Sequence, residues 1–163
     1  EANQVGVNGA QSLATSLNLK NLETLFLDSN PIGPEGAEAL ARSTCLPSLT
    51  ALHMDSTGIG DQGVKAIAAS QTLSKIKKLY LCSNKIGDEG AIALSQSPNL
   101  SHLTCLSIWR NEIRDAGGKA IAESNHFLKL ERLYMSLNLI EKPTRKLIRA
   151  SDMASRLKTL VMD

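Results

Sequence analysis

The sequence is poor in aromatic residues, in cysteine and in long apolar runs. Aromatic residues make up 3% of the chain against 42% for hydrophobic residues of every kind, so the core must be built mostly from Leu, Ile and Ala. Three cysteines are too few for the disulfide framework of a small secreted domain. No apolar run approaches the roughly 20 residues that a membrane-spanning helix needs, so none is expected.

The net charge is also small. A formal charge of +2 indicates neither nucleic acid nor a membrane surface as the partner. The 163 residues suffice for one domain with a substantial core. No signal peptide is visible. Because the first residue is Glu1 and not Met, a leader or an upstream domain could have been removed.

What the sequence does contain is one unit repeated every 27 residues, without insertion or deletion. The copies begin with LETLFLDSN at Leu22, LTALHMDST at Leu49, IKKLYLCSN at Ile76, LTCLSIWRN at Leu103, LERLYMSLN at Leu130 and LKTLVMD at Leu157. We expect a single domain over 1–163, in which partial repeats 1–21 and 157–163 flank the repeats 22–48, 49–75, 76–102, 103–129 and 130–156. We expect this domain to be a piece of a longer protein.

Each unit contains one strand and one helix. Leu79, Leu81 and Ile86 alternate with outward positions, as in a short strand. Asn84 ends the strand, and its amide is predicted to bond the backbone of neighbouring turns. Asp88 is predicted to be the N-cap of the following helix. Asp61 and Asp115 are expected to play the same role.

Stacking such units gives a curved molecule. Neighbouring strands are about 4.8 Å apart, whereas packed helices need about 8–10 Å. The helices must therefore fan out on the outer side of a parallel sheet.

The pattern LxxLxLxxNxIGxxGAxALA resembles the leucine-rich repeat, and the IGDEGA-type helix start resembles the ribonuclease-inhibitor-like subclass. The resemblance covers nearly the whole chain. It implies an α/β solenoid shaped as a curved horseshoe, with a parallel sheet on the concave face and helices on the convex face. It also implies binding of a partner protein on the inner sheet. Members of the subclass include an enzyme inhibitor, Ran GTPase-activating proteins, sensor arms of immune receptors and bacterial effectors.

The repeat assigns a direction to every strand side chain. Four of the five aromatic residues fall at inner-face positions and avoid the Leu positions of the core. Hot spots of interfaces favour Trp, Tyr and Arg, although aromatic residues also suit strands for packing alone. The residues predicted to bind a partner are Phe26, Asp28, His53, Asp55, Tyr80, Trp109, Arg110, Arg132 and Tyr134.

Two other functions are open to comparison. Cys82, Asp55 and His53 fall close together and could form a nucleophile, an orienting group and a base, or bind zinc. An open sheet face without an oxyanion hole or a lid argues against both. The resemblance also allows a GTPase-activating regulator, with Arg110 as the residue to test.

The cysteine positions indicate the kind of cellular compartment in which the protein works. Cys82 and Cys105 fall at opposite ends of the inner face, too far apart for a disulfide, and Cys45 falls in a return segment. Three free thiols favour a reducing, cytoplasmic location, or a host cytosol for a bacterial effector.

The last repeat, EKPTRKLIRASDMASRLK, is basic and irregular. Arg145 and Arg149 replace small or apolar residues, and Thr144 replaces a Gly of the earlier copies. We interpret it as a degenerate unit with a solvated face, although such charge could also bind nucleic acid or an anionic membrane.

We therefore expect a monomeric protein-binding module. We expect no enzyme activity, no cofactor, no metal, no nucleic acid and no membrane. Trp109 marks the most promising repeat for partner contact.

Overall fold

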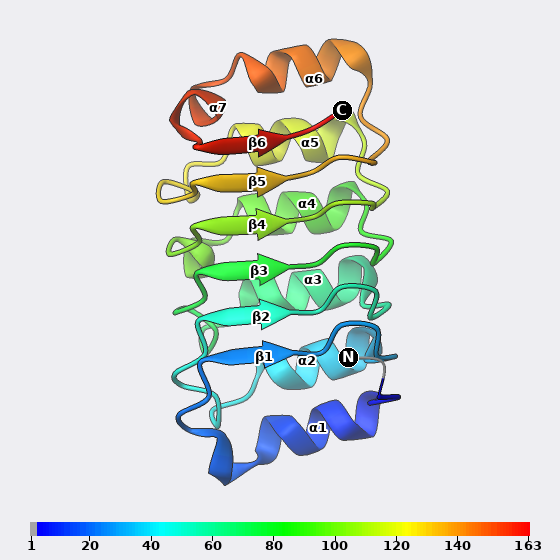
Figure 1. Ribbon diagram of the computed structural model, residues 1–163, viewed down its shortest axis with the longest axis vertical. Helices are drawn as coiled ribbons and strands as arrows, with labels where there is room; N and C mark the ends of the chain where they lie inside the picture. Colours follow the sequence, from blue (N-terminus) through cyan, green and yellow to red (C-terminus); the bar gives the residue numbers. More distant parts are fainter. Residues whose placement is uncertain (1–2) are drawn as a thin grey trace.

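The computed structural model describes residues 3–163, in which helices alternate with strands along the chain (Figure 1). The helices are α1 (Val7–Thr15), α2 (Gly33–Ala41), α3 (Gly60–Ala69), α4 (Asp88–Ser95), α5 (Asp115–Ala122), α6 (Lys142–Arg149) and α7 (Asp152–Arg156). The strands are β1 (Thr24–Phe26), β2 (Ala51–His53), β3 (Lys78–Tyr80), β4 (Cys105–Ser107), β5 (Arg132–Tyr134) and β6 (Thr159–Val161). The short 3-10 helices η1 (Leu17–Leu19) and η2 (Pro98–Leu100) lie in return segments between a helix and the next strand.

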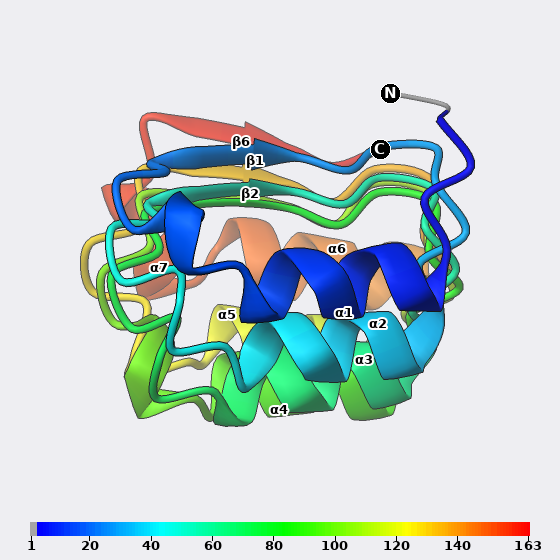
Figure 2. The same cartoon turned by 90° about the horizontal axis from the view of Figure 1, so that it is seen from below.

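The strands form one six-stranded parallel sheet in chain order. Each residue pairs with its repeat equivalent, as Thr24 does with Ala51 and Leu52 with Leu79. The helices cover one face of the sheet and leave the other open (Figure 2). Figure 1 shows the helices spread over a longer stretch than the strands, as their wider spacing requires. The predicted α/β solenoid, with its sheet on the concave side, is confirmed.

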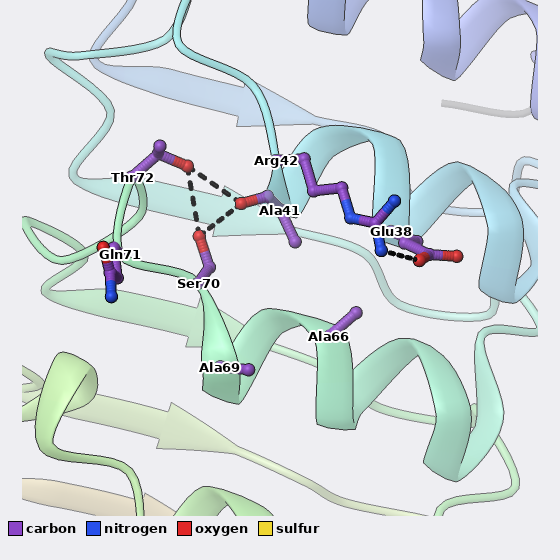
Figure 3. Close-up of a pocket in the computed structure, with 8 residues that line it drawn as sticks. All are labelled: Glu38, Ala41, Arg42, Ala66, Ala69, Ser70, Gln71 and Thr72. Carbon is purple, nitrogen blue, oxygen red and sulfur yellow. Dashed lines mark hydrogen bonds and ion pairs between the residues drawn. The ribbon is translucent and has the colours of Figure 1, made fainter.

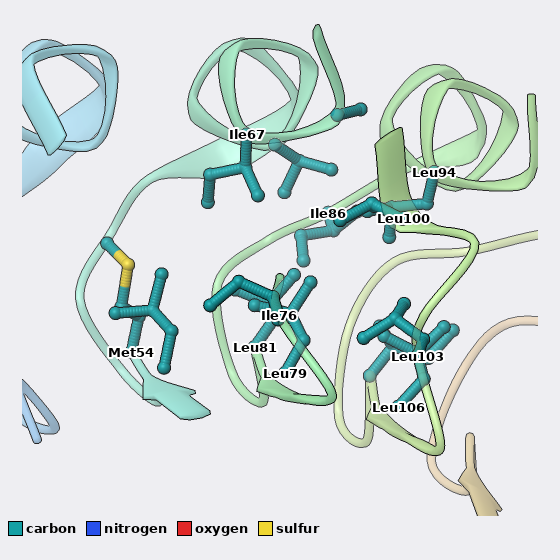
Figure 4. Packing of buried hydrophobic residues seen from close by; sticks show 14 of the residues in the cluster. Met54, Ile67, Ile76, Leu79, Leu81, Ile86, Leu94, Leu100, Leu103 and Leu106 are labelled. Atoms are coloured by element: carbon teal, nitrogen blue, oxygen red, sulfur yellow. The ribbon is translucent and has the colours of Figure 1, made fainter. Parts of the chain in front are cut away.

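Aliphatic side chains fill the space between the sheet and the helices. Leu79 and Leu81 are fully buried, in agreement with the predicted alternation. Figure 4 shows them between the strands and the helices, with Ile67 of α3 and Leu94 of α4 on the helix side. Among the described residues, Phe127 is the only aromatic side chain of the core, and it lies in a return segment.

The helix starts differ from the prediction. Asp88 does not cap its own helix, because it is the first residue of α4 and Gly87 is the N-cap. Its Oδ1 accepts hydrogen bonds from the backbone N–H groups of Arg114 and Gly117, at the start of α5. Asp61 bonds Gly87 and Gly90 of the following repeat in the same way, and Asp115 bonds Glu141. These aspartates satisfy the free amides of the next helix and so couple neighbouring repeats.

An asparagine holds the turn after most of the strands, as predicted. Asn84 Oδ1 accepts from the backbone N–H groups of Thr57 and Gly58, and its Nδ2 donates to the carbonyls of Met54 and Cys82. Equivalent contacts are made by Asn30, Asn111 and Asn138. Each amide pairs backbone groups that a turning chain leaves free.

A second row of polar contacts is made by serines that follow the C-terminal ends of helices α2 to α5. The hydroxyls of Ser43, Ser70, Ser97 and Ser124 each donate to a backbone carbonyl of the preceding repeat. Ser151 breaks the series: it donates to the carbonyl of Ile148, and it caps α7 by accepting from Ala154. The last repeat is therefore joined to its neighbour by fewer polar contacts.

Helix packing explains the other departure of the last repeat. A Cβ on Gly117 would lie 2.6 Å from Asp88 Oδ1 and 2.9 Å from Ala91 Cβ, so α5 approaches α4 too closely for any side chain there. Thr144 occupies the equivalent position of α6 and is buried. The larger residue keeps α6 from repeating this close approach, consistent with the predicted irregular unit.

Candidate binding surface

The open side of the sheet, here called the inner face, carries the first and third side chains of each strand and the residues at the strand exits. The structure gathers the predicted partner-binding residues there: Phe26, Asp28, His53, Asp55, Tyr80, Trp109, Arg110, Arg132 and Tyr134. Their common location follows from the repeat, whereas binding stays a prediction.

An aromatic stack crosses the first three strands. The ring centroids of Phe26 and His53 are 4.2 Å apart, and those of His53 and Tyr80 are 4.1 Å apart with an interplanar angle of 14°. Burial lowers the pKa of His53, although the carboxylates of Asp28 and Asp55 act in the opposite direction. The imidazole is therefore mostly neutral at pH 7 and serves as a packing element between two rings.

The two inner-face aspartates of this region bond the backbone. Asp28 Oδ1 accepts from the N–H of Asp55 at 2.8 Å, and Asp55 Oδ1 accepts from the N–H of Cys82 at 2.7 Å. Burial raises the pKa of Asp55 in spite of that hydrogen bond. Both carboxylates thus have a structural role that the sequence interpretation did not assign to them.

Small side chains stand at the inner-face positions of β4. Cys105 and Ser107 are only 1% and 6% exposed, although their side chains stand on the open face. The register places Lys78 and Tyr80 on one side of them, and Arg132 and Tyr134 on the other. The larger neighbours therefore cover Cys105 and Ser107, and the six residues form a packed group, here called the β4 patch.

The larger residues of the β4 patch carry polar groups with unused hydrogen-bonding capacity. The Tyr80 hydroxyl lies 3.8 Å from Cys105 Sγ. Burial, with this contact, raises the pKa of Tyr80 to about 12, so the phenol stays protonated. Arg132 Nε is shielded from solvent and has no hydrogen-bond partner. Within residues 3–163, the ion pairs join Arg42 to Glu38, Lys65 to Glu89 and Lys158 to Glu131, and none includes Lys78 or Arg132.

Trp109 and Arg110 follow β4 at its exit. Trp109 is 38% exposed, and Arg110 is exposed with a left-handed backbone. The exit positions Ser29, Ser56, Ser83 and Leu137 share this positive φ. The turn is therefore a property of the repeat, and the Arg110 side chain is not needed to form it.

Cys82, which falls close to Asp55 and His53, does not have the features of a catalytic nucleophile. Cys82 is buried, and its Sγ lies 3.0 Å from Ser107 Oγ. Burial raises the pKa of the Cys82 thiol to about 11, which disfavours the reactive thiolate. In the described part of the chain, no group of three His, Cys, Asp or Glu residues is placed to hold a metal ion. Cys45, Cys82 and Cys105 are free thiols.

Sequence reasoning missed the burial of Cys105 and Ser107 on the open face. Its signal is the small volume of these two residues between larger equivalents on β3 and β5, which a comparison of side-chain sizes along each row would have found. Leu137 and Leu139, after β5, are exposed as well and were not predicted as site residues.

The cavities on the outer surface have fewer features of a binding site. One of about 330 Å³ lies between the ends of α2 and α3 (Figure 3). Several of its polar groups are already paired: Ser70 and Thr72 donate to the carbonyl of Ala41, and Arg42 bonds Glu38. It is a groove between successive helices, and similar grooves occur between α1 and α2 and between α4 and α5.

Family comparison agrees with this repeat architecture. The sequence model of the family described as Leucine Rich repeat matches residues 16–41, 45–68, 72–95 and 99–122, which is more than half of the chain. The chain belongs to the leucine-rich repeat family. No curated protein matches it in sequence.

A solved leucine-rich repeat structure shows the same fold. An internalin (InlF) from Listeria monocytogenes aligns with a TM-score of 0.56 and 21% sequence identity. The alignment covers 94% of this chain and 45% of the internalin, so the chain spans less than half of that protein. Among residues 3–163, no helix is long and apolar enough to cross a membrane.

Proposed function

We propose that this leucine-rich repeat chain is a protein-interaction module that binds a partner protein through its inner face and carries out no chemistry itself. One observation supports this most: four of the five aromatic residues stand on the open face, while the core is aliphatic. Phe26 is 55% exposed and Trp109 is 38% exposed, which a role in core packing does not explain. Exposed aromatic groups beside arginine are typical of interface hot spots.

The inner face offers contacts of two kinds. Phe26, Tyr80, Trp109 and Tyr134 provide apolar area, whereas Arg110 and Arg132 provide charge without internal partners. Such charges favour an oriented encounter with a complementary protein. We propose that the chain acts as a monomer and uses neither nucleic acid nor a membrane surface.

We also propose that the repeats are of the ribonuclease-inhibitor-like subclass. Helices of 8 to 10 residues in α2 to α5, each following an IG-type or similar start, support this assignment. The alternative of a GTPase regulator that uses Arg110 has no observation in its favour beyond the repeat family, and it is not proposed.

The test is a binding measurement with matched variants. A partner is captured on the immobilised chain, identified, produced in pure form and titrated by calorimetry. Trp109→Ala with Tyr134→Ala is expected to weaken binding by about 100-fold, since hot-spot aromatics dominate interfaces. The control, Leu17→Ala with Leu128→Ala, removes apolar groups that are more exposed than Trp109 from the return segments, and it is expected to bind like wild type. Undiminished binding by the inner-face variant would contradict the proposal.

A further inference from the structure

We propose that the exits of β4 and β5 recognise the partner protein, by receiving a segment in which apolar side chains stand next to a carboxylate. The four residues that carry this proposal are here called the exit rim: Trp109, Arg110, Leu137 and Leu139. The inference rests on the proposed function, because it names the chemistry by which the chain would recognise its partner.

The exit rim lies on two neighbouring turns at one edge of the sheet. All strands run in the same direction, so their exits lie along the same edge (Figure 1). Leu137 is the equivalent of Arg110 one repeat later, which places the two on adjacent turns. The N–H of Leu139 donates to the carbonyl of Ile113 at 2.8 Å and holds the second turn against the first. A partner can therefore contact both turns at once.

Three large apolar side chains are exposed in the exit rim. Trp109 is 38% exposed, Leu137 is 53% exposed and Leu139 is 48% exposed. In the first two complete repeats the equivalent residues are Asp, then Ser, then Pro or Gly. The same fold therefore forms with small or polar residues at these positions. Exposed apolar groups that the fold does not require are typical of a surface that binds another protein.

Two of these residues also cost the fold stability. Asp28 and Asp55 each accept a hydrogen bond from a backbone N–H of the following repeat, and the Trp109 side chain cannot accept one in the same position. Leu137 has a φ of 53°, a left-handed backbone that a bulky side chain disfavours. Exposed residues that weaken the fold in this way point to a role in binding.

A cavity of about 290 Å³ adjoins the exit rim between the turns that follow β3 and β4. It is lined by Ser83, Lys85, Arg110, Asn111 and Glu112. The ion pairs within residues 3–163 include none of the three charged residues of this lining. Because two cations face one carboxylate, the cavity has one net positive charge. This charge is complementary to a single carboxylate of the partner.

A phosphate fits the cavity less well than a carboxylate. It carries about −1.5 to −2 charge, and clusters of arginines usually bind it. Here the lining has one guanidinium, and Glu112 opposes a second negative charge. Arg110 can pair with a carboxylate through two parallel N–H bonds. The partner segment is therefore inferred to place apolar side chains on Trp109 and the two leucines, with Asp or Glu beside Arg110.

The experiment is a selection from displayed random 12-residue peptides on the whole chain and on two variants. Trp109→Asp with Leu137→Ser gives the exit rim the residue types of the first two complete repeats, and Arg110→Ser gives it the residue type of Ser83. Wild type is expected to enrich peptides with apolar residues next to Asp or Glu at a fixed position. The double variant should lose the apolar preference, and Arg110→Ser should lose only the acidic one.

Two controls alter exposed residues outside the exit rim. Leu17→Ala with Leu128→Ala removes apolar groups of the return segments, and Lys119→Ser removes a cation of α5. Both should keep the wild-type preferences. Thermal melting shows whether each variant is folded. Leu137→Ser alone is expected to melt no lower than wild type and still to weaken a selected peptide about 10-fold, so the test does not depend on the double variant.

A selected peptide is then titrated by fluorescence anisotropy beside its Glu→Gln and Glu→phosphoserine forms. The Gln form is expected to bind wild type about 10-fold more weakly than the Glu form, and to bind Arg110→Ser as well as the Glu form does. A phosphoserine form that binds wild type more than 10-fold tighter than the Glu form would replace the carboxylate with a phosphate.

The remaining outcomes separate the exit rim from the proposed function. Peptides that bind the exit-rim variants as tightly as wild type, but bind Phe26→Ala with Tyr80→Ala more weakly, overturn the exit rim and leave the interaction module standing. An acidic preference that survives Arg110→Ser overturns the carboxylate site. No enrichment on any form counts against both proposals.

Discussion

The two halves of the inner face differ in whether their polar side chains have partners within the chain. Over β1 to β3, side chains contact each other: His53 stacks between Phe26 and Tyr80, and Asp55 bonds the backbone of Cys82. Over β4 and β5, Arg132 carries a buried donor without a partner, beside the small residues Cys105 and Ser107. Both halves have the same backbone and register. The difference is one of satisfied against unsatisfied side chains, and it indicates where a partner gains most by binding.

A large residue on β4 should change the second half most. Ser107 is 6% exposed and its Oγ lies 3.0 Å from Cys82 Sγ, so the ring of Ser107→Phe has no space unless it displaces Tyr80 or Tyr134. Binding of the captured partner, measured by calorimetry, is expected to fall by about 100-fold, because the displaced rings lie at the centre of the proposed interface. The control Ser136→Phe adds a ring to the inner face outside β4 and is expected to have a smaller effect. Equal losses for both variants would remove the distinction between the two halves.

Removing a satisfied group should destabilise the first half. Asp55→Ala leaves the N–H of Cys82 without its acceptor and is expected to lower the free energy of unfolding by about 1–3 kcal/mol. Asp55→Asn keeps an acceptor oxygen and removes a charge whose burial raises the pKa of Asp55. This variant should be at least as stable as wild type at pH 7 in urea unfolding. A loss of stability as large as that of Asp55→Ala would show that the charge itself is needed.

Removing an unsatisfied group should do the opposite in the second half. Arg132→Met keeps an unbranched apolar stem and eliminates the buried Nε. The free energy of unfolding is expected to rise by about 1 kcal/mol, because no orphan donor remains. If Arg132→Met instead destabilises the chain, the guanidinium has a structural role and the contrast between the halves is weakened.

Much of this fold could be predicted from the sequence, because each feature recurs in several copies. The repeat starts at Leu22 and Ile76, the turn amide of Asn84 and the inward rows all follow from one period. A single sequence position is ambiguous, but six copies in register leave one arrangement that buries every Leu position. The inner-face location of the predicted site residues follows from the same reasoning.

What could not be predicted depends on contacts between repeats. Asp88 stands at a helix start, and only the distance to Gly117 in the next repeat decides which helix it caps. Asp28 was expected to face a partner, yet its carboxylate bonds the N–H of Asp55. The burial of Cys105 and Ser107 depends on the larger side chains of the neighbouring strands. Such features need coordinates, because the repeat pattern gives directions for side chains but not their contacts.

The smallest expected effect is the pH dependence of stability that His53 introduces through the ring stack. Because burial lowers the pKa of His53 in the folded chain, the unfolded chain binds the proton more tightly. Stability is therefore full above the ordinary histidine pKa of about 6.5 and decreases as the pH falls below it toward the lowered value. We expect the urea midpoint of wild type to fall between pH 7.5 and pH 5.5, and to fall less in His53→Phe, which keeps a ring between Phe26 and Tyr80. The control His102→Phe alters an exposed histidine of a return segment, and it should retain the wild-type slope. Equal slopes for wild type and His53→Phe would mean that burial in the ring stack does not lower the pKa of His53. The first half would then tolerate a buried positive charge, in contrast to what its contacts indicate.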